Sequence, residues 1–292
     1  MSDLISGFLN IAKPLGVTSH DVVAQVRREL GVKKVGHAGT LDPMATGVLV
    51  LCLGSATRLS EFVMQSVKQY RATVHLGVVT DTYDREGQIV SERDASGVTL
   101  AAVEQALTAF LGEIEQMPPM YSAIKQGGRK LYDIARAGGA VERESRKLRI
   151  DRLHISEWSP PRFVLEVTCS AGTYIRSLAY DLGEALGVGA HLAGLIRTAS
   201  GRFTLEQAIP LETLLNNADW PSQIIAPNEA LADWPTIHLD AAAIERIRHG
   251  RALTDPQAVQ GALALAYLPD GELAAVVRGQ NGVWKPEKVF LS

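Results

Sequence analysis

The chain has 292 residues, of which 46% are apolar, enough for a sizeable core in one large domain or two. Its apolar stretches are no longer than a strand, which excludes a bilayer-spanning helix, and the N-terminus MSDLISGFLN lacks the pattern of a secretory signal. Cys52 and Cys169 lie in apolar, strand-like runs, with no CxxC pair or Cys/His cluster. We therefore expect buried free thiols, no structural zinc site and a cytoplasmic location.

The net charge of −3 conceals an uneven distribution. Residues 1–202 carry 23 basic and 21 acidic side chains, whereas residues 203–292 carry 6 and 11. Within 120–150, eight basic residues face three acidic ones. The acidic C-terminal third argues against non-specific polyanion binding, so any contact with a polyanion should come from local patches. The basic stretch is equally typical of a solvated charged face.

Strand and helix signals alternate in the first half of the chain. Thr18-Ser19 predicts the start of one amphipathic helix, and Thr99 predicts the cap of another. The uninterrupted apolar run 48–53 predicts a buried strand. In chain order we expect a strand at 8–11, a helix at 20–30, a strand at 48–53, a short helix at 55–63, a strand at 69–76 and a helix at 100–111.

The second half opens with a long irregular segment, 117–146, and such segments inside compact domains are usually functional. Strands at 147–157 and 163–170, a helix from Thr173 to about Leu186 and short helices after Gly201 follow. The alternation predicts an α+β fold with a central mixed or antiparallel sheet flanked by helices. Trp234-Pro235 indicates a boundary between a domain over 1–235 and a small, mainly β module over 236–292, with one helix near 241–249 and three strands.

The stretch from Gly36 to Pro43, GHAGTLDP, precedes the buried strand and presents one carboxylate, Asp42, in a turn. Pro43 disfavours helical geometry at Asp42, and Gly36 and Gly39 permit backbone angles closed to other residues. Loops on rigid scaffolds often carry chemistry. An Asp before Pro is also an ordinary turn-former, because its side chain bonds nearby backbone amides.

HAGTLDPMATGVL resembles the catalytic motif of the pseudouridine synthases that act on the tRNA T-loop, and of their relatives in guide-RNA particles. Four further segments resemble this family's motifs in the same order, so the resemblance covers about residues 8 to 205. These segments are NIAKPLGVTS from Asn10, KQY from Lys68 with Leu76-Gly77, GTYIRSL from Gly172 and HLAGLIRT from His191.

The resemblance implies a pseudouridine synthase core followed by a PUA-like C-terminal module. It implies isomerisation of the uridine at position 55 of the tRNA T-loop to pseudouridine, with the target base flipped out of the RNA. No cofactor and no metal are implied, because the reaction involves no redox step and requires no energy source. The expected partner is tRNA; the absence of long basic tails favours a stand-alone enzyme, a monomer without an obligate protein partner.

The resemblance also assigns roles. Asp42 would be the covalent nucleophile, a role that carboxylates can fill. Arg176 would pair with it and offset the desolvation of its charge. A cation in the first turn of a helix opposes the helix dipole, so an anionic partner such as Asp42 would explain Arg176. Tyr70 would stack on the reacting uracil, although its sequence context is also that of a strand aromatic in the core.

Further roles follow from the same resemblance. Leu195 would form the apolar wall opposite Tyr70, and Tyr174 would line the pocket. His37 would fill or prop the space that the flipped base leaves. Lys13 would fix its loop or face a phosphate. The inserted segment 117–146 would grip the RNA.

Three alternatives remain open from the sequence. One is a guide-RNA-dependent relative that works with partner proteins. Another is a carboxylate glycosidase, which requires a second carboxylate about 5–10 Å from Asp42, with Asp81 and Asp84 as candidates. The third is a non-enzymatic RNA-binding protein, for which an Asp42→Asn variant would keep all biological activity.

Overall fold

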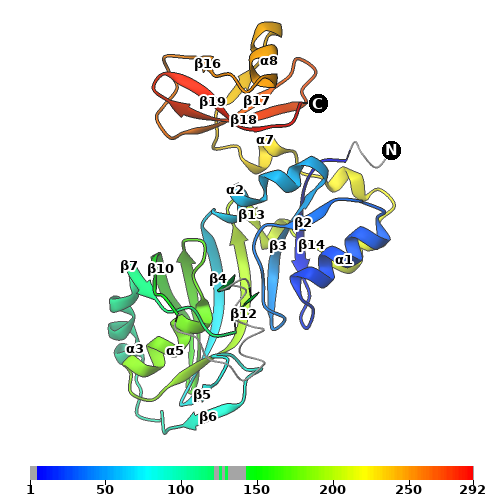
Figure 1. The fold of residues 1–292 in the computed structure, drawn as a ribbon. Coiled ribbons are helices and arrows are strands. Elements are labelled where there is room, and N and C mark those ends of the chain that lie inside the picture. Colours follow the sequence, from blue (N-terminus) through cyan, green and yellow to red (C-terminus); the bar gives the residue numbers. More distant parts are fainter. Residues whose placement is uncertain (1–4, 122–124, 127–128, 131–142, 292) are drawn as a thin grey trace.

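The computed structural model describes residues 5–121, 125–126, 129–130 and 143–291 (Figure 1). A ten-stranded sheet forms the frame of the larger part, in the order β14-β1-β3-β12-β4-β11-β10-β7, with β2 and β13 paired to β3 and β12. The sheet is mixed, because β12 runs parallel to β3 and β1 parallel to β14. Its strands are β1 (Gly7–Lys13), β2 (Val35–His37), β3 (Ala45–Leu53), β4 (Lys68–Leu76), β7 (Gly112–Gln116), β10 (Arg146–Ser159), β11 (Arg162–Cys169), β12 (Ala190–Ser200), β13 (Phe203–Thr204) and β14 (Ile209–Pro210).

Outside the sheet, the described residues of this part form helices, 3-10 turns and two short ribbons. The helices are α1 (Ser19–Glu29), α2 (Ser60–Met64), α3 (Leu100–Leu107), α5 (Ile175–Ala185), α6 (Leu211–Leu215) and α7 (Pro227–Ala230), with 3-10 turns η1 (Gly54–Leu59), η2 (Thr108–Phe110), η3 (Leu205–Gln207) and η4 (Trp220–Gln223). The ribbons pair β5 (Val78–Thr80) with β6 (Ile89–Glu92) and β8 (Lys125–Gln126) with β9 (Arg129–Lys130).

Strand β3 is buried on both faces, which explains its uninterrupted apolar sequence. Leu49 and Leu51 belong to the main core cluster with residues of α1 and α5. Val48 and Val50 on the other face belong to a second cluster that includes Leu265 of the C-terminal module. The strand that follows the Asp42 loop is therefore held by packing on both sides.

The C-terminal module is a five-stranded sheet with one helix, α8 (Ala241–Arg248). Its strands β15 (Thr236–His238), β16 (Leu253–Thr254), β17 (Leu263–Tyr267), β18 (Leu273–Gln280) and β19 (Val283–Val289) lie in the order β15-β17-β18-β19-β16. It docks on η1 and α2: Arg58 donates to the Val289 carbonyl at 2.6 Å and lies 4.6 Å from the Phe290 ring, while Lys288 pairs with Glu61. The expected fold class, an α+β core with a mainly β module, is confirmed.

Most expected elements are present, with three corrections. The C-terminal module has five strands where three were expected. Thr18 caps α1 and Thr99 caps α3 through their side chains, as the sequence predicts. Thr173 does not cap α5, which begins at Ile175 after Tyr174. The strand over Ala190–Ser200 was not expected, although it lies in the middle of the sheet. Both cysteines are buried and free.

Candidate active site

The Asp42 turn joins β2 to β3 and is tied to the chain that precedes it. Ser19 Oγ accepts from the Leu41 amide at 2.8 Å and donates to the Leu41 carbonyl at 3.1 Å. Gly16 N donates to the Pro43 carbonyl, and Ala45 N donates to the Asp42 carbonyl at 3.0 Å. These bonds flank the carboxylate on both sides, so the turn holds it in one place.

Arg197 of β12 holds the same turn through hydrogen bonds to its backbone carbonyls, a role that the sequence did not suggest. Its side chain is buried, and its guanidinium donates to the carbonyls of Val48 (2.7 Å), Gly39 (3.1 Å) and Thr40 (3.4 Å). Gly47 has a φ of 98°, and a Cβ there would lie 2.3 Å from the Arg197 carbonyl oxygen. The sequence signal for this role was an arginine within an apolar run, HLAGLIRT. A cation in such a run is expected to be buried, and a buried cation requires hydrogen-bond partners.

Lys13, which was expected either to fix its loop or to face a phosphate, bonds backbone carbonyls. It is 1% exposed, and its ammonium donates to the carbonyls of Pro14 (2.8 Å) and Val17 (2.7 Å), with Pro43 at 3.5 Å. Burial lowers its pKa to about 8, against the opposing charge of Asp42. These contacts are those of a cation that fixes its loop, and contact with a phosphate stays a prediction.

Arg176 and Asp42, which are 134 residues apart, form the expected ion pair. Nε of Arg176 lies 3.0 Å from Oδ2 of Asp42, and Nη2 lies 3.4 Å from Oδ1. The arginine side chain is only 6% exposed. It also donates to the carbonyls of Thr82 (3.3 Å) and Tyr121 (2.8 Å), and to Asp84 at 3.2 Å. The first turn of α5 is therefore directed at two carboxylates.

Asp84 is the second carboxylate of this network, and sequence analysis considered it only as a glycosidase candidate. Its side chain is 5% exposed. One oxygen accepts from Arg176; the other accepts from Thr82 Oγ1 at 2.7 Å and from the Glu86 amide at 3.0 Å. The signal that could have identified it is the polar turn TDTYD beside a strand, since such turns position side-chain oxygens.

The Asp42 carboxylate is under opposing influences. Burial raises its pKa, Arg176 lowers it, Asp84 raises it and Lys13 lowers it. The side chain nevertheless retains 36% of its exposure, so it is accessible from one side. A partly desolvated carboxylate fixed by a guanidinium is suited to act as a nucleophile or a base.

Tyr70 and Leu195 lie on neighbouring strands and on the same face of the sheet. Both are 8% exposed. Tyr70 of β4 is opposite Arg197, and Leu195 of β12 is opposite Ala45, which begins β3. Burial raises the pKa of Tyr70, whereas the neighbouring Arg197, which also bonds Gly39 and Thr40 of the Asp42 turn, lowers it. The structure thus brings both residues to the Asp42 turn.

His37 and Tyr174 lie at the edges of this group. His37 ends β2; burial lowers its pKa, and its buried Nδ1 has no hydrogen-bond partner among the described residues. Its ring is 6.0 Å from that of His20. Gln116 fixes the backbone of Tyr174, accepting from its amide at 2.8 Å and donating to its carbonyl at 3.0 Å. Tyr174 thereby sets the entry of the chain into α5.

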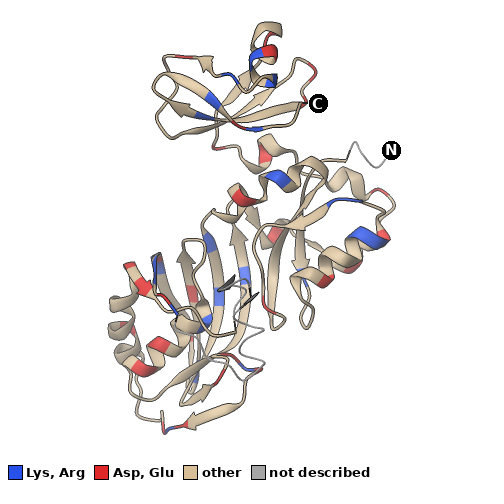
Figure 2. Ribbon diagram, viewed as in Figure 1, with Lys and Arg blue, Asp and Glu red and all other residues tan. Residues whose placement is uncertain are grey.

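The segment 117–146, expected to grip RNA, lies largely outside the described residues, as do the side chains of Lys125, Arg129 and Lys130. Its first residues pack on α5, because Ser177 Oγ donates to the Met117 carbonyl at 2.9 Å and Arg176 donates to that of Tyr121. Charges of both signs are distributed over the catalytic sheet and the module alike (Figure 2).

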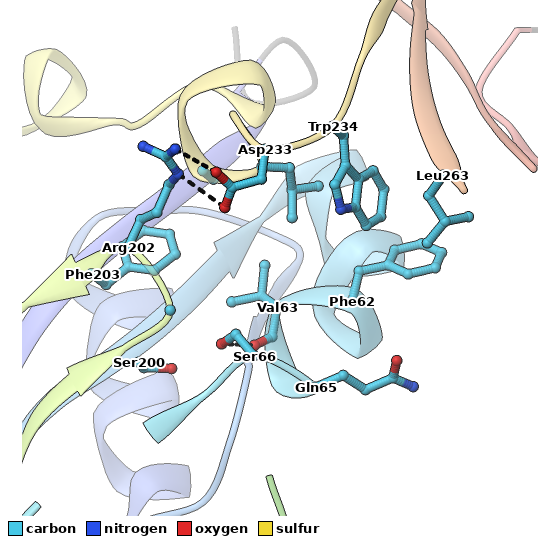
Figure 3. A pocket seen from close by; sticks show the side chains of 13 residues that line it. Phe62, Val63, Gln65, Ser66, Ser200, Arg202, Phe203, Asp233, Trp234 and Leu263 are labelled. Atoms are coloured by element: carbon cyan, nitrogen blue, oxygen red, sulfur yellow. Dashed lines mark hydrogen bonds and ion pairs between the residues drawn. The ribbon is translucent and has the colours of Figure 1, made fainter. Parts of the chain in front are cut away.

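A cavity of about 300 Å³ lies at the junction with the C-terminal module rather than beside Asp42. Its walls include Phe62 and Trp234, whose rings meet edge to face at 5.1 Å (Figure 3). Arg202 and Asp233 pair at 2.6 Å on its border. Its residues contribute none of the contacts at Asp42 described above, and we regard it as a packing feature of the junction.

Comparison with known proteins identifies the class of protein to which this chain belongs. A chain in the crystal structure of a Cbf5-Nop10-Gar1 complex is similar to this chain, with a TM-score of 0.76 and 29% sequence identity. The match covers 99% of this chain and 86% of that chain. The model of the TruB family pseudouridylate synthase N-terminal domain matches residues 27–175, and that of the tRNA pseudouridylate synthase B C-terminal domain matches residues 176–232. The chain belongs to the TruB family of pseudouridine synthases.

Curated relatives specify the family member. The tRNA pseudouridine synthase B of Symbiobacterium thermophilum is 52% identical over 85% of this chain and 83% of its own length. That of Burkholderia pseudomallei (strain 668) is 44% identical over 99% and 98%. The protein is thus an isomerase that converts uridine in tRNA to pseudouridine. Within the described part of the chain, no helix has the length and apolar character of a membrane span.

Proposed function

We propose that the protein isomerises uridine 55 in the tRNA T-loop, with Asp42 as the covalent nucleophile. The observation that carries this proposal is the Asp42–Arg176 pair, in which a partly exposed carboxylate meets a buried guanidinium at 3.0 Å. Breaking a glycosidic bond and rejoining the base through carbon requires a nucleophile, and a fixed carboxylate can supply one. Arg176 and Lys13 both favour its ionised form.

The surrounding residues match the needs of a flipped base. A base removed from its stack requires an apolar or aromatic surface in the protein. Tyr70 would contact the uracil on one side and Leu195 on the other, with Tyr174 at the border. His37, whose Nδ1 has no hydrogen-bond partner among the residues that the structure describes, would occupy the space vacated in the RNA. The basic segment 117–146 would hold the RNA backbone.

A glycosidase fits the geometry less well. Such an enzyme requires a second carboxyl group free to give or take a proton. Both oxygens of Asp84 already accept hydrogen bonds, from Arg176, Thr82 and the Glu86 amide. With both oxygens occupied in this way, Asp84 is suited to orienting Arg176.

The stand-alone enzyme is favoured over a guide-RNA-dependent one, because curated relatives at 44–52% identity are tRNA pseudouridine synthases B, while the Cbf5 chain is 29% identical. We propose a cytoplasmic monomer that needs neither cofactor nor obligate protein partner. Residues 1–235 would form the catalytic domain and 236–292 a PUA-like module.

The test is a pseudouridine map of tRNA transcripts treated with Asp42→Asn and Asp42→Ala. Both variants should fold and bind tRNA but form no pseudouridine. Asp94→Asn is the matched control, since Asp94 is an exposed turn aspartate that bonds the Ser96 amide. Turnover by the Asp42 variants at the wild-type rate would remove Asp42 from the mechanism. Modification confined to a uridine other than 55 would refute the position.

A further inference from the structure

Tyr83 is held in a backbone conformation that bulky residues rarely adopt. Its φ is 63°, in the left-handed region, where a side chain crowds the backbone. Its ring stacks on that of Tyr180, with centroids 4.0 Å apart and planes 19° from parallel. Glycine or asparagine would fit such a position with less strain. The aromatic stack offers a reason for a tyrosine here.

The stack lies directly beside the network of Arg176. Tyr180 follows Arg176 by four residues on α5, so the two side chains lie on the same face of the helix, one turn apart. Arg176 contacts Thr82 and Asp84, which are the residues on either side of Tyr83. Helix α5 therefore grips three consecutive residues of one turn, two through the guanidinium and one through the tyrosine ring.

The other bonds of this turn do not fix its position against α5. Two hydrogen bonds lie within the turn: Tyr83 N donates to the Thr80 carbonyl at 3.2 Å, and Thr80 Oγ1 donates to the Asp84 carbonyl at 2.6 Å. Leu192 N donates to the Tyr83 carbonyl at 3.0 Å and joins the turn to β12. Among the described residues, the turn meets α5 through the guanidinium bonds and through the Tyr83–Tyr180 stack.

We infer that Tyr83 and Tyr180 are positioning residues, which hold the 82–84 turn so that Asp84 and the Thr82 carbonyl orient Arg176 toward Asp42. Without the stack, the turn loses its second anchor on α5 and the guanidinium loses its fixed orientation. Small misplacements of a catalytic group cost rate rather than binding. The inference rests on the proposed roles of Asp42 and Arg176.

Single-turnover measurements with Tyr83→Gly test this inference. Glycine relieves the strained φ and removes the ring, so a turn that needs only its backbone conformation would keep its rate. We expect the rate constant to fall roughly tenfold while the dissociation constant for tRNA stays within about twofold. Tyr83→Phe retains the stack and should remain within about threefold of wild type. Asn281→Gly controls for glycine at another left-handed position, φ 51°, in the C-terminal module.

Two further variants separate positioning from folding and from RNA contact. Tyr180→Ala removes the stack without altering the turn, and should reproduce the loss of rate. In an Asp84→Asn background, Tyr83→Gly should lower the rate constant by a further factor of less than about two, because both changes act through Arg176. An unchanged rate in Tyr83→Gly or Tyr180→Ala would overturn the inference. Fully additive effects of Tyr83→Gly and Asp84→Asn on the rate constant would also overturn it. So would a loss of tRNA affinity at an unchanged saturating rate, since that result would assign the rings to RNA contact.

The assay keeps this inference apart from the proposed function. Tritium release from tRNA labelled at uridine C5 measures total pseudouridine formation, because the new bond replaces that hydrogen. Primer extension of the same product then locates the site. Modification at another uridine refutes the T-loop proposal while the Tyr83 comparison still stands. Pseudouridine formation by Asp42→Asn at the wild-type rate refutes the role of Asp42 as nucleophile. The rates of the Tyr83 variants are still compared with the wild-type rate, so the effect of the stack is measured in either case.

Discussion

Replacement of Arg176 by lysine should reduce catalysis although it conserves the charge. The guanidinium makes five contacts of 3.4 Å or less, to both oxygens of Asp42, to Asp84 and to the carbonyls of Thr82 and Tyr121. A lysine ammonium is a compact point charge and cannot reproduce a planar fork. The side chain is 6% exposed, so water does not replace the lost donors.

The magnitude follows from those contacts. Breaking a buried ion pair costs about 3–5 kcal/mol, and the 36% exposure of Asp42 and the retained charge reduce that figure to about 2–3 kcal/mol. If the loss falls on the transition state, the rate constant drops about 30- to 150-fold. Arg176→Met, which removes the charge, should lose more.

Single-turnover kinetics with excess enzyme on a tRNA transcript measure this directly, together with tRNA binding and thermal unfolding. Arg93→Lys is the control, because Arg93 pairs with Glu184 of the same helix α5 at 3.5 Å and is 45% exposed. It should behave as wild type, since exposed pairs contribute little. An Arg176→Lys rate within about threefold of wild type would refute the argument that the fork geometry matters.

Four further predictions concern the site and its surroundings. Since burial raises the pKa of Asp42 and the charge of Asp84 adds to the rise, activity should fall as pH decreases through that pKa; Asp84→Asn should move this acid limb to lower pH and Arg176→Met to higher pH. Gly47→Ala should destabilise the fold by about 2–3 kcal/mol in chemical denaturation, because its Cβ would meet the Arg197 backbone, whereas Gly97→Ala faces open space and should stay within about 0.5 kcal/mol. Charge reversal in the segment 117–146 should weaken tRNA binding and flatten its salt dependence, because phosphate contacts release counterions, and an unchanged slope would leave a solvated face; the residues to change are Lys125, Arg129 and Lys130. A short T-loop hairpin should be modified in excess EDTA; loss of activity that one metal restores would mean that the site has been misread, with Asp42, Asp81 and Asp84 as possible oxygen ligands.

Local signals account for the elements that the sequence predicted. The caps at Thr18 and Thr99, and the apolar run of β3, depend on residues a few positions apart, and the structure contains all three. Strand β12 was missed because its pairing with β4 shifts register between Leu192 and Gly194 and again between Arg197 and Ala199. Those shifts disrupt the alternation that identifies strands.

The candidate site shows the same division. Asp42 and its contact with Arg176 were expected from motifs. The turn around Asp84 and the clamp by Arg197 were not, because each depends on contacts between segments about 90 to 160 residues apart in the chain. Sequence spacing does not reveal which strand will lie beneath a loop, and that information comes from the sheet order.

The sheet order also determines when, during synthesis, the protein can become active. Strand β3 ends at Leu53, but its neighbour β12 begins at Ala190, and β1 pairs with Ile209 and bridges to Ile225 through Phe8. At ribosomal rates of about 5–20 residues per second, β3 waits roughly 7–30 s for β12. During that time β3 can already pair with β1 and β2, but the edge that β12 will occupy stays open. The Asp42 turn acquires its anchors late, once both Arg176 and Arg197 have left the ribosome.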